Sequence, residues 1–196
     1  MALTLEKIRA ARERIAPYII TTPLLRLPAL DPFFGCRVHA KAECLQTTGA
    51  FKLRGAMNKV LQLSEKELSR GVVAASSGNH GRGLAYAAKA LGIPATIVIP
   101  DTAPQLKVDN ILALGARVVR CGLSERFDVA ERLVKETGAV MVPPYNDEDI
   151  MAGQGTIGLG GVLEGKIPVR PDENVCFVIS GGSIAPEQLD LLKNIE

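Results

Sequence analysis

The sequence predicts an α/β protein in which parallel sheets are covered by helices. Short apolar runs rich in β-branched residues alternate with helix-like segments over residues 72–142. Glycines also stand where left-handed caps of those helices belong, at Gly92, Gly115 and Gly138. Because repeated strand, helix, strand units require parallel pairing, helices are expected on both faces of the sheet.

The expected elements begin with a helix that Thr4 can cap and that ends before Pro17. A strand follows over residues 38–42, and its alternation predicts one buried and one exposed face. Later strands are expected at Val72–Ala75, Ala95–Ile99, Val118–Cys121, Val140–Val142 and Val175–Ile179. Helices are expected at Gly81–Leu91, Gln105–Leu114 and Ser124–Glu136, with a further helix-like stretch beyond Asp147.

Composition excludes several classes of protein. With 23 basic against 21 acidic residues and only 4% aromatics, a nucleic-acid-binding surface is not indicated. No stretch approaches the roughly 20 apolar residues of a membrane span, so a soluble cytoplasmic protein is expected. The four cysteines lack CxxC spacing and only two histidines are present, which predicts buried free thiols and no metal site.

The segment TGAFKLRGA, residues 48–56, places Lys52 at a loop-to-helix boundary beside Phe51. A lysine becomes a nucleophile when apolar neighbours and nearby positive charge disfavour its ammonium form. Taken alone, Lys52 is more simply a solvated surface charge, which is the usual state of lysine.

The segment SSGNHG, residues 76–81, directly follows an expected strand and opens an expected helix. Its amides and hydroxyls can hold an anion at the helix N-terminus, and ligands of parallel sheets collect at this edge. A polar turn is the alternative for this segment alone.

The two segments, in this order, resemble the serine/threonine dehydratases and serine racemases of pyridoxal-phosphate fold type II. The resemblance continues through KAE at 41–43, LGIPA at 91–95, GARVV at 115–119 and AGQGT at 152–156, and covers the first 159 residues. It implies a two-domain fold type II architecture with pyridoxal 5'-phosphate as the cofactor.

The resemblance implies that four residues bind the cofactor. Lys52 would form a Schiff base with it and later move the substrate's α-proton, while Phe51 would flank the ring. Asn79 would contact the ring hydroxyl, and Ser180 would face the pyridine nitrogen. A neutral partner there suits β-elimination and racemisation more than transamination. Without the resemblance, Ser180 simply begins a strand-ending turn.

The substrate is expected to contact the SSGNHG segment. Under the resemblance, Ser76, Ser77, Asn79 and His80 belong to the loop that binds the substrate carboxylate. Ser77 also matches the serine that acts as acid or base on the opposite face in the racemases. For His80, a hydrogen-bonded histidine within a turn is the alternative to direct proton transfer.

Residues 153–158 spell GxGxxG, and Glu173 follows about twenty residues beyond Gly153, as in dinucleotide-binding turns. We expect no dinucleotide here, because no expected strand leads into Gly153 and Glu173 lies in a Pro-containing turn.

The resemblance further implies that the larger domain is incomplete. Residues 154–159 pass directly into residues 160–166, which resemble a segment close to the family's C-terminus, so a middle portion with the phosphate-binding loop is absent. The glycines at 160–161 are not expected to replace that loop, because they follow a helix-like stretch. A genuine short protein, a deletion, and the ordered part of a longer enzyme all stay open.

Residues 71–145 are expected to form the smaller α/β domain, and residues 1–70 and 146–196 the larger one. Because an incomplete sheet leaves strand edges unpaired, homo-oligomers are expected.

The predicted function is that of an ammonia-lyase, or dehydratase, which converts L-threonine or L-serine into a 2-oxo acid and ammonia by β-elimination. Serine racemisation is the alternative among enzymes, and a catalytically inactive chain is the alternative outside them. The expected partner is a small amino acid, with neither nucleic acid nor membrane. Preference for serine or threonine, effectors and cation dependence are not predicted from these residues.

Overall fold

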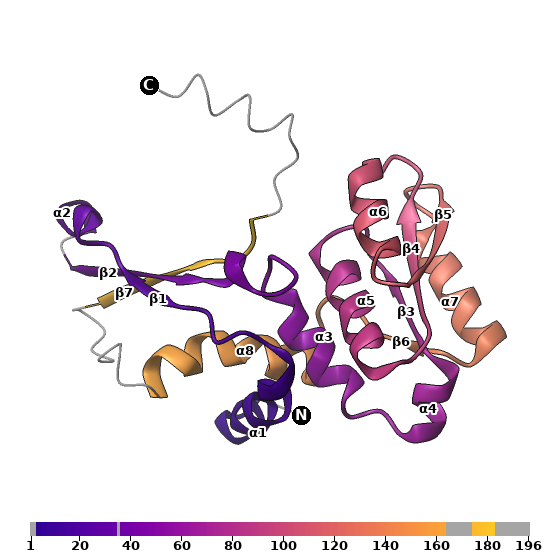
Figure 1. Ribbon diagram of the computed structural model, residues 1–196, viewed down its shortest axis with the longest axis horizontal. Coiled ribbons are helices and arrows are strands. Elements are labelled where there is room, and N and C mark those ends of the chain that lie inside the picture. Colours follow the sequence, from indigo (N-terminus) through magenta and orange to yellow (C-terminus); the bar gives the residue numbers. More distant parts are fainter. Residues whose placement is uncertain (1–2, 35, 164–173, 183–196) are drawn as a thin grey trace.

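The computed structural model describes residues 3–34, 36–163 and 174–182, which contain two sheets (Figure 1). The first has the order β1-β2-β7, with bounds Leu24–Arg26, Arg37–Ala42 and Asn174–Ile179. The second has the order β5-β4-β3-β6, with bounds Arg117–Cys121, Ala95–Pro100, Val72–Ala75 and Val140–Met141. All pairings are parallel except that of β1 with β2. The predicted α/β class is confirmed, and β1 is an antiparallel addition to it.

Helices cover these sheets and connect them. The α-helices are α1 (Leu5–Ile15), α2 (Asp31–Phe34), α3 (Lys52–Val60), α4 (Glu65–Arg70), α5 (Asn79–Leu91), α6 (Gln105–Leu112), α7 (Arg126–Thr137) and α8 (Glu148–Leu163). In the described part of the chain, 3-10 turns lie at Ala16–Tyr18, Pro28–Leu30 and Glu43–Leu45.

The helix ends follow the expected chemistry. The Thr4 side chain accepts a hydrogen bond from the Lys7 amide at 3.3 Å and caps α1. Gly92 and Gly138 end α5 and α7 with φ of 67° and 70°, in the left-handed region that glycine adopts without strain. Gly115 also has a positive φ, 83°, but α6 has already ended at Leu112, so this glycine turns the chain into β5.

The four-stranded sheet reverses its winding at β3. The chain runs from β3 to β4 and β5 in one direction, through α5 and α6, and then returns past β3 to β6 through α7. Right-handed crossovers therefore place α5 and α6 on one face and α7 on the other, as Figure 1 shows. Since ligands bind such sheets where the strand order reverses, the segments that leave β3 and β6 mark the expected site.

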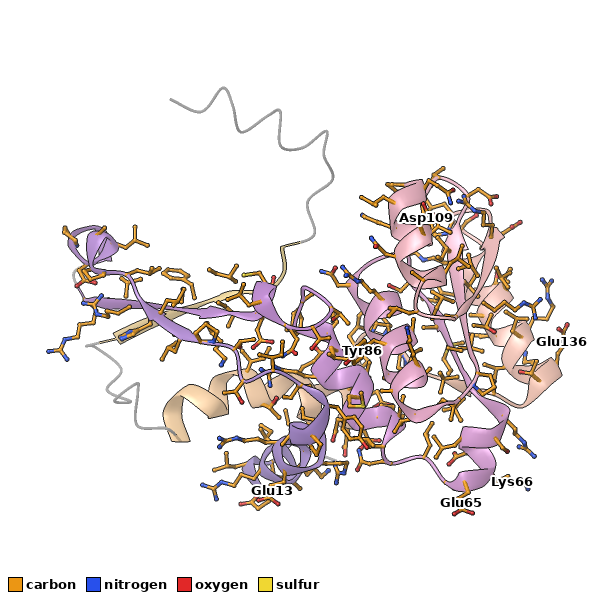
Figure 2. The ribbon with its side chains drawn as sticks, viewed as in Figure 1. Glu13, Glu65, Lys66, Tyr86, Asp109 and Glu136 are labelled. Atoms are coloured by element: carbon orange, nitrogen blue, oxygen red, sulfur yellow. The ribbon has the colours of Figure 1, made fainter. Side chains whose placement is uncertain are left out.

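Alternate residues of β3 bury both faces of this sheet. Val72 and Ala74 join a core cluster with residues of α3 and α5, whereas Val73 and Ala75 join a second cluster with residues of α7. Tyr86, labelled in Figure 2, packs against the first cluster where α5 approaches α3. Helix α3 thus packs in the core of the four-stranded sheet, although in the chain it follows β2 of the three-stranded sheet.

Helices α3 and α8 approach closely through glycines. A Cβ added to Gly153 would lie 2.4 Å from the Arg54 carbonyl oxygen and 2.8 Å from the Gly55 Cα. The GxGxxG segment therefore lies inside a packed helix, not at a strand-to-helix turn. The glycines at 160–161 also lie within α8, where helix amides are not free to bind a phosphate.

The expected half-burial of β2 is wrong. His39 and Lys41 are 8% and 7% exposed, and Glu43, just after the strand, is fully buried. The face that the alternation assigned to solvent is covered by other parts of the chain, which periodicity within one strand cannot reveal.

The expectation of buried thiols holds only for Cys121. Cys36 and Cys44 are partly exposed and Cys176 is exposed, although all four are free. Within the described ranges, no helix is long and apolar enough to cross a membrane. The domain boundaries after residues 70 and 145 stay a prediction.

Candidate active site

Lys52 begins α3, and its amine faces the segment that follows β6. The amine donates a hydrogen bond to the carbonyl oxygen of Pro144 at 2.8 Å. Burial lowers the pKa of the Lys52 amine below its ordinary value, which increases the fraction of neutral, nucleophilic amine at a given pH. The Phe51 ring lies beside it, with its centroid 5.0 Å from the Lys52 nitrogen.

The segment from Ser76 to Gly81 leaves the carboxyl end of β3, as expected. The Ser76 amide continues the sheet by donating to the Val98 carbonyl at 3.0 Å. A Cβ added to Gly81 would lie 2.1 Å from the Ser76 carbonyl oxygen, so only glycine lets α5 begin this close to β3. Asn79 is the first residue of α5 and follows Gly78, its N-cap.

His80 is buried, and its hydrogen bond fixes the tautomer. Its Nε2 lies 2.8 Å from the Val142 carbonyl oxygen, which can only accept, so Nε2 carries the hydrogen. The Nδ1 atom is buried and has no hydrogen-bond partner among the residues that the structure describes. Burial lowers the pKa of His80 to about 4; the hydrogen bond to Val142 opposes this shift and the charge of Lys52 adds to it. A neutral, hydrogen-bonded His80 fits a positioning role better than proton transfer.

The segment that leaves β6, residues 142–146, faces both residues and will be called the connecting segment. It provides the Val142 carbonyl to His80 and the Pro144 carbonyl to Lys52. Asn146 takes a left-handed conformation with φ 57°, directly before Asp147, whose carboxylate accepts hydrogen bonds from two amides at the start of α8. The connecting segment therefore joins β6 to α8 while aiming two carbonyl groups at the site.

Residues 180–182 run antiparallel beside residues 49–51. The Phe51 amide donates to the Ser180 carbonyl at 3.1 Å, and Ala50 forms a bridge with Gly181. A Cβ added to Gly181 would lie 3.0 Å from the amide nitrogen of the Asn79 side chain. The end of β7, the loop before Lys52 and the start of α5 therefore meet at one place.

A cavity of about 160 Å³ lies in front of the SSGNHG segment. Its lining consists of Ser77, Gly78, Asn79, Arg82, Lys107 and Asn110. A Cβ added to Gly78 would meet no atom of the described residues within 4 Å, so among them the loop faces open space. The two cations and the amides give this cavity a lining suited to an anionic group.

All seven residues predicted for the site are described, and the structure brings five of them together. Phe51, Lys52, Asn79 and Ser180 gather around the 49–51 and 180–182 pair, and His80 joins them through the connecting segment. Ser76 directly follows β3, and Ser77 lines the adjacent cavity. Their roles stay predictions.

The groups that hold Lys52 and His80 could not be predicted from the sequence. Both are backbone carbonyls, and a carbonyl has no signature in a sequence. Among the described residues, no group of three or more His, Cys, Asp and Glu side chains is placed to hold a metal ion.

Known proteins resemble this chain in sequence and in fold. A family model described as pyridoxal-phosphate dependent enzyme matches residues 15–185. A serine racemase of Arabidopsis thaliana is 44% identical over 179 residues, which are 90% of this chain and 53% of the relative. An L-threonine ammonia-lyase of Thermotoga maritima is 45% identical over 182 residues, 92% of this chain and 44% of the relative.

The solved structure of maize serine racemase superposes with a TM-score of 0.81 at 41% identity, over 86% of this chain and 51% of that one. The chain thus spans about half the length of the relatives that it matches.

Proposed function

This chain belongs to the pyridoxal-phosphate-dependent enzyme family, and from that membership we propose that it is an ammonia-lyase that acts on L-serine or L-threonine. Lys52 is the proposed cofactor-binding lysine. One observation carries the proposal. The Lys52 amine, whose pKa is lowered, donates a hydrogen bond to the Pro144 carbonyl. This contact lies where the strand order of the four-stranded sheet reverses, beside the SSGNHG segment.

The residues around Lys52 fit the ring of the cofactor. A partly buried amine with a depressed pKa suits attack on an aldehyde. The Asn79 amide lies over Gly181, where a side chain would crowd it, so this glycine leaves the amide in place as a hydrogen-bond donor. Phe51 supplies an apolar wall and Ser180 a neutral hydroxyl at the end of β7.

When bound, the cofactor supplies an electron sink that makes the α-proton of an attached amino acid acidic. The chain's own residues then have three tasks. Lys52 holds or takes up the proton at its amine, and the Pro144 carbonyl orients that amine when it is free. His80, neutral near pH 7, keeps the connecting segment in place without competing for the proton.

The amino-acid substrate is proposed to bind by its carboxylate to the start of α5. Ser76, Ser77, Asn79 and His80 form the turn there, and a helix N-terminus favours an anion. The overall reaction would convert L-serine or L-threonine into a 2-oxo acid and ammonia.

Serine racemisation is the second candidate. Its support is that a serine racemase matches this chain as well as an ammonia-lyase does, at 44% against 45% identity. Ser77 would then provide the second proton-transfer group from the cavity side.

Association into homo-oligomers is also proposed. Its support is the apolar β7 strand, where Phe177, Val178 and Ile179 are each more than 40% exposed. Sedimentation velocity over a range of concentrations would test it, and a monomer at all concentrations would oppose it.

The test of function begins with the covalent link. Purified protein is incubated with pyridoxal phosphate, reduced with borohydride and digested, and the modified peptide is identified by mass spectrometry in wild type and Lys52→Ala. We expect modification of Lys52 in wild type alone. L-Serine and L-threonine are then supplied, and 2-oxo acid and D-serine are measured to separate the two candidates.

No linkage at saturating cofactor would overturn the proposed activity for this chain and favour the catalytically inactive alternative.

A further inference from the structure

A buried ion pair involves the first turn of α3, which Lys52 begins, and takes no part in the chemistry described above. Glu43 follows β2 and is fully buried, and Arg54 is 4% exposed. The Arg54 Nε donates to Glu43 Oε2 at 2.8 Å, and Nη2 donates to Oε1 at 2.8 Å. This two-point contact fixes the orientation of the guanidinium as well as its distance.

The pair is part of a larger polar network around residues 20–22. Thr22 donates its hydroxyl to Glu43 Oε1 at 2.5 Å. Gln46 exchanges two hydrogen bonds of 2.9 Å with the Ile20 backbone. The network therefore attaches residues 20–22 to the start of the loop that leads from Glu43 to Lys52, and the ion pair connects it to Arg54 beyond the end of that loop.

Such a pair is a poor way to stabilise a fold. Two charges removed from water lose hydration that their mutual attraction repays only partly, and apolar replacements of similar volume are often as stable. The geometry of the pair indicates instead that it fixes the position of the first turn of α3. Arg54 lies in the first turn of α3, two residues after Lys52. Because a helix is rigid over one turn, holding the Arg54 side chain fixes the depth and rotation of the Lys52 backbone.

The other side of the same turn is held by backbone packing. A Cβ added to Gly83 of α5 would lie 3.1 Å from the Leu53 amide nitrogen, so α5 rests directly on the start of α3. The Lys52 amine itself, at the end of a flexible side chain, has the Pro144 carbonyl as its hydrogen-bond acceptor. Small shifts of the backbone would thus move the amine away from that carbonyl.

We infer that Glu43 is a positioning residue for Lys52, acting through Arg54, which holds the first turn of α3 at the depth where the Lys52 amine meets the connecting segment. The expected effect of Glu43 on cofactor binding rests on the proposed function. Its expected effect on the position of Lys52 does not depend on any bound cofactor.

The main test replaces both charges with apolar side chains of similar length, in the double variant Glu43→Met, Arg54→Met. We expect its melting temperature to stay within about 5 °C of wild type, since the desolvation cost of the pair is removed with it. We expect the rate of borohydride-trapped linkage of pyridoxal phosphate to Lys52 to fall about 10- to 100-fold, as for a group displaced by about an ångström.

A second readout needs no cofactor. Acetic anhydride is applied over a range of pH, and the acetylation of Lys52 is measured by mass spectrometry against exposed Lys66. In the double variant we expect the pH midpoint for Lys52 to rise toward that of ordinary lysines, because the amine leaves its partly buried position. A merely structural pair would leave this midpoint unchanged in a folded variant.

Arg26→Met provides the matched control. Arg26 donates to the Asp31 carboxylate at 2.7 Å. It lies on β1, which pairs with the β2 strand that precedes Glu43, and it is away from Lys52. Its loss should leave the linkage rate and the acetylation midpoint as in wild type.

The inference is overturned if the folded double variant keeps both the wild-type linkage rate and the wild-type midpoint. Should that variant fail to fold, Thr22→Val decides, because it removes one hydrogen bond from Glu43 and keeps both charges; an unchanged midpoint then overturns the inference. If wild type itself forms no link with the cofactor, the proposed function fails, while the acetylation profile still tests the position of Lys52.

Discussion

Lys52 and His80 are held by the same connecting segment, through carbonyl groups two residues apart. The Lys52 amine donates to the Pro144 carbonyl at 2.8 Å, and His80 Nε2 lies 2.8 Å from the Val142 carbonyl. The two residues are also close enough for the charge of Lys52 to contribute to the lowered pKa of His80. A change at either residue is therefore expected to reach the other through residues 142–144.

The first prediction concerns acid stability. The folded pKa of His80 is about 4 and its ordinary value is 6.5, so between these values the unfolded chain binds the additional proton. The contribution of neutral His80 is therefore present above pH 6.5 and is lost as pH falls toward 4. It amounts to about 3 kcal/mol in the free energy of unfolding. Urea unfolding of wild type at several pH values should show this loss.

His80→Gln keeps an amide donor for the Val142 carbonyl but has no group that titrates in this range. Its free energy of unfolding should depend less steeply on pH between 4 and 6.5. An identical slope in the two proteins would contradict the prediction, as would a ¹⁵N spectrum at pH 7 with the proton on Nδ1.

The second prediction concerns the reactivity of Lys52 in the free protein. Burial lowers the pKa of the Lys52 amine, so its neutral form is populated at lower pH than for an ordinary lysine. In a competitive acetylation experiment, Lys52 should reach half of its maximal rate at lower pH than Lys66, which Figure 2 shows on the outer side of α4. Coincident pH profiles for the two residues would show that Lys52 is not held in a partly buried position.

A third prediction addresses Gly181, whose added Cβ would lie 3.0 Å from the Asn79 amide nitrogen and 3.3 Å from the Ala50 Cβ. Gly181→Ala should displace the Asn79 amide and weaken the retention of pyridoxal phosphate about tenfold. That corresponds to one hydrogen bond of about 1.4 kcal/mol. Equilibrium dialysis of the cofactor would measure the change.

Gly122→Ala is a matched control for that substitution. Its added Cβ would also have its nearest contact at 3.0 Å, but with the carboxylate of Glu125, an exposed side chain that can move aside. Cofactor retention should therefore be as in wild type. Equal loss in the two variants would remove the assignment of Asn79 to the cofactor.

Much of this architecture could be predicted from the sequence, because it rests on local rules. The β3 strand, the capping of α1 by Thr4 and the turn from β3 into α5 each depend on residues adjacent in the chain. The burial of Lys41 and Glu43 could not be predicted, since it depends on residues 20–22 and on Arg54, which periodicity within β2 does not include. The carbonyls of Val142 and Pro144 were missed for a different reason: any residue could provide them.

The last prediction follows from the GxGxxG segment within α8. In Gly153→Ala the new Cβ would lie 2.4 Å from the Arg54 carbonyl oxygen and 2.8 Å from the Gly55 Cα, and backbone atoms in a packed helix pair cannot move aside cheaply. Overpacking of this kind costs about 1–3 kcal/mol, and the helix propensity of alanine returns about 1 kcal/mol. The difference between these two figures gives an expected net loss of up to about 2 kcal/mol in the free energy of unfolding, measured by urea titration.

Gly155→Ala, two residues along the same helix, separates the two effects. The three atoms nearest to its Cβ would all belong to the Ile8 side chain, the first at 3.1 Å, and a side chain can change its rotamer. This variant should therefore be as stable as wild type or slightly more so. If both alanines were tolerated equally, the close approach of α3 and α8 would not be a constraint on this segment. The difference between the two variants thus tests whether the glycine pattern serves helix packing beneath Lys52.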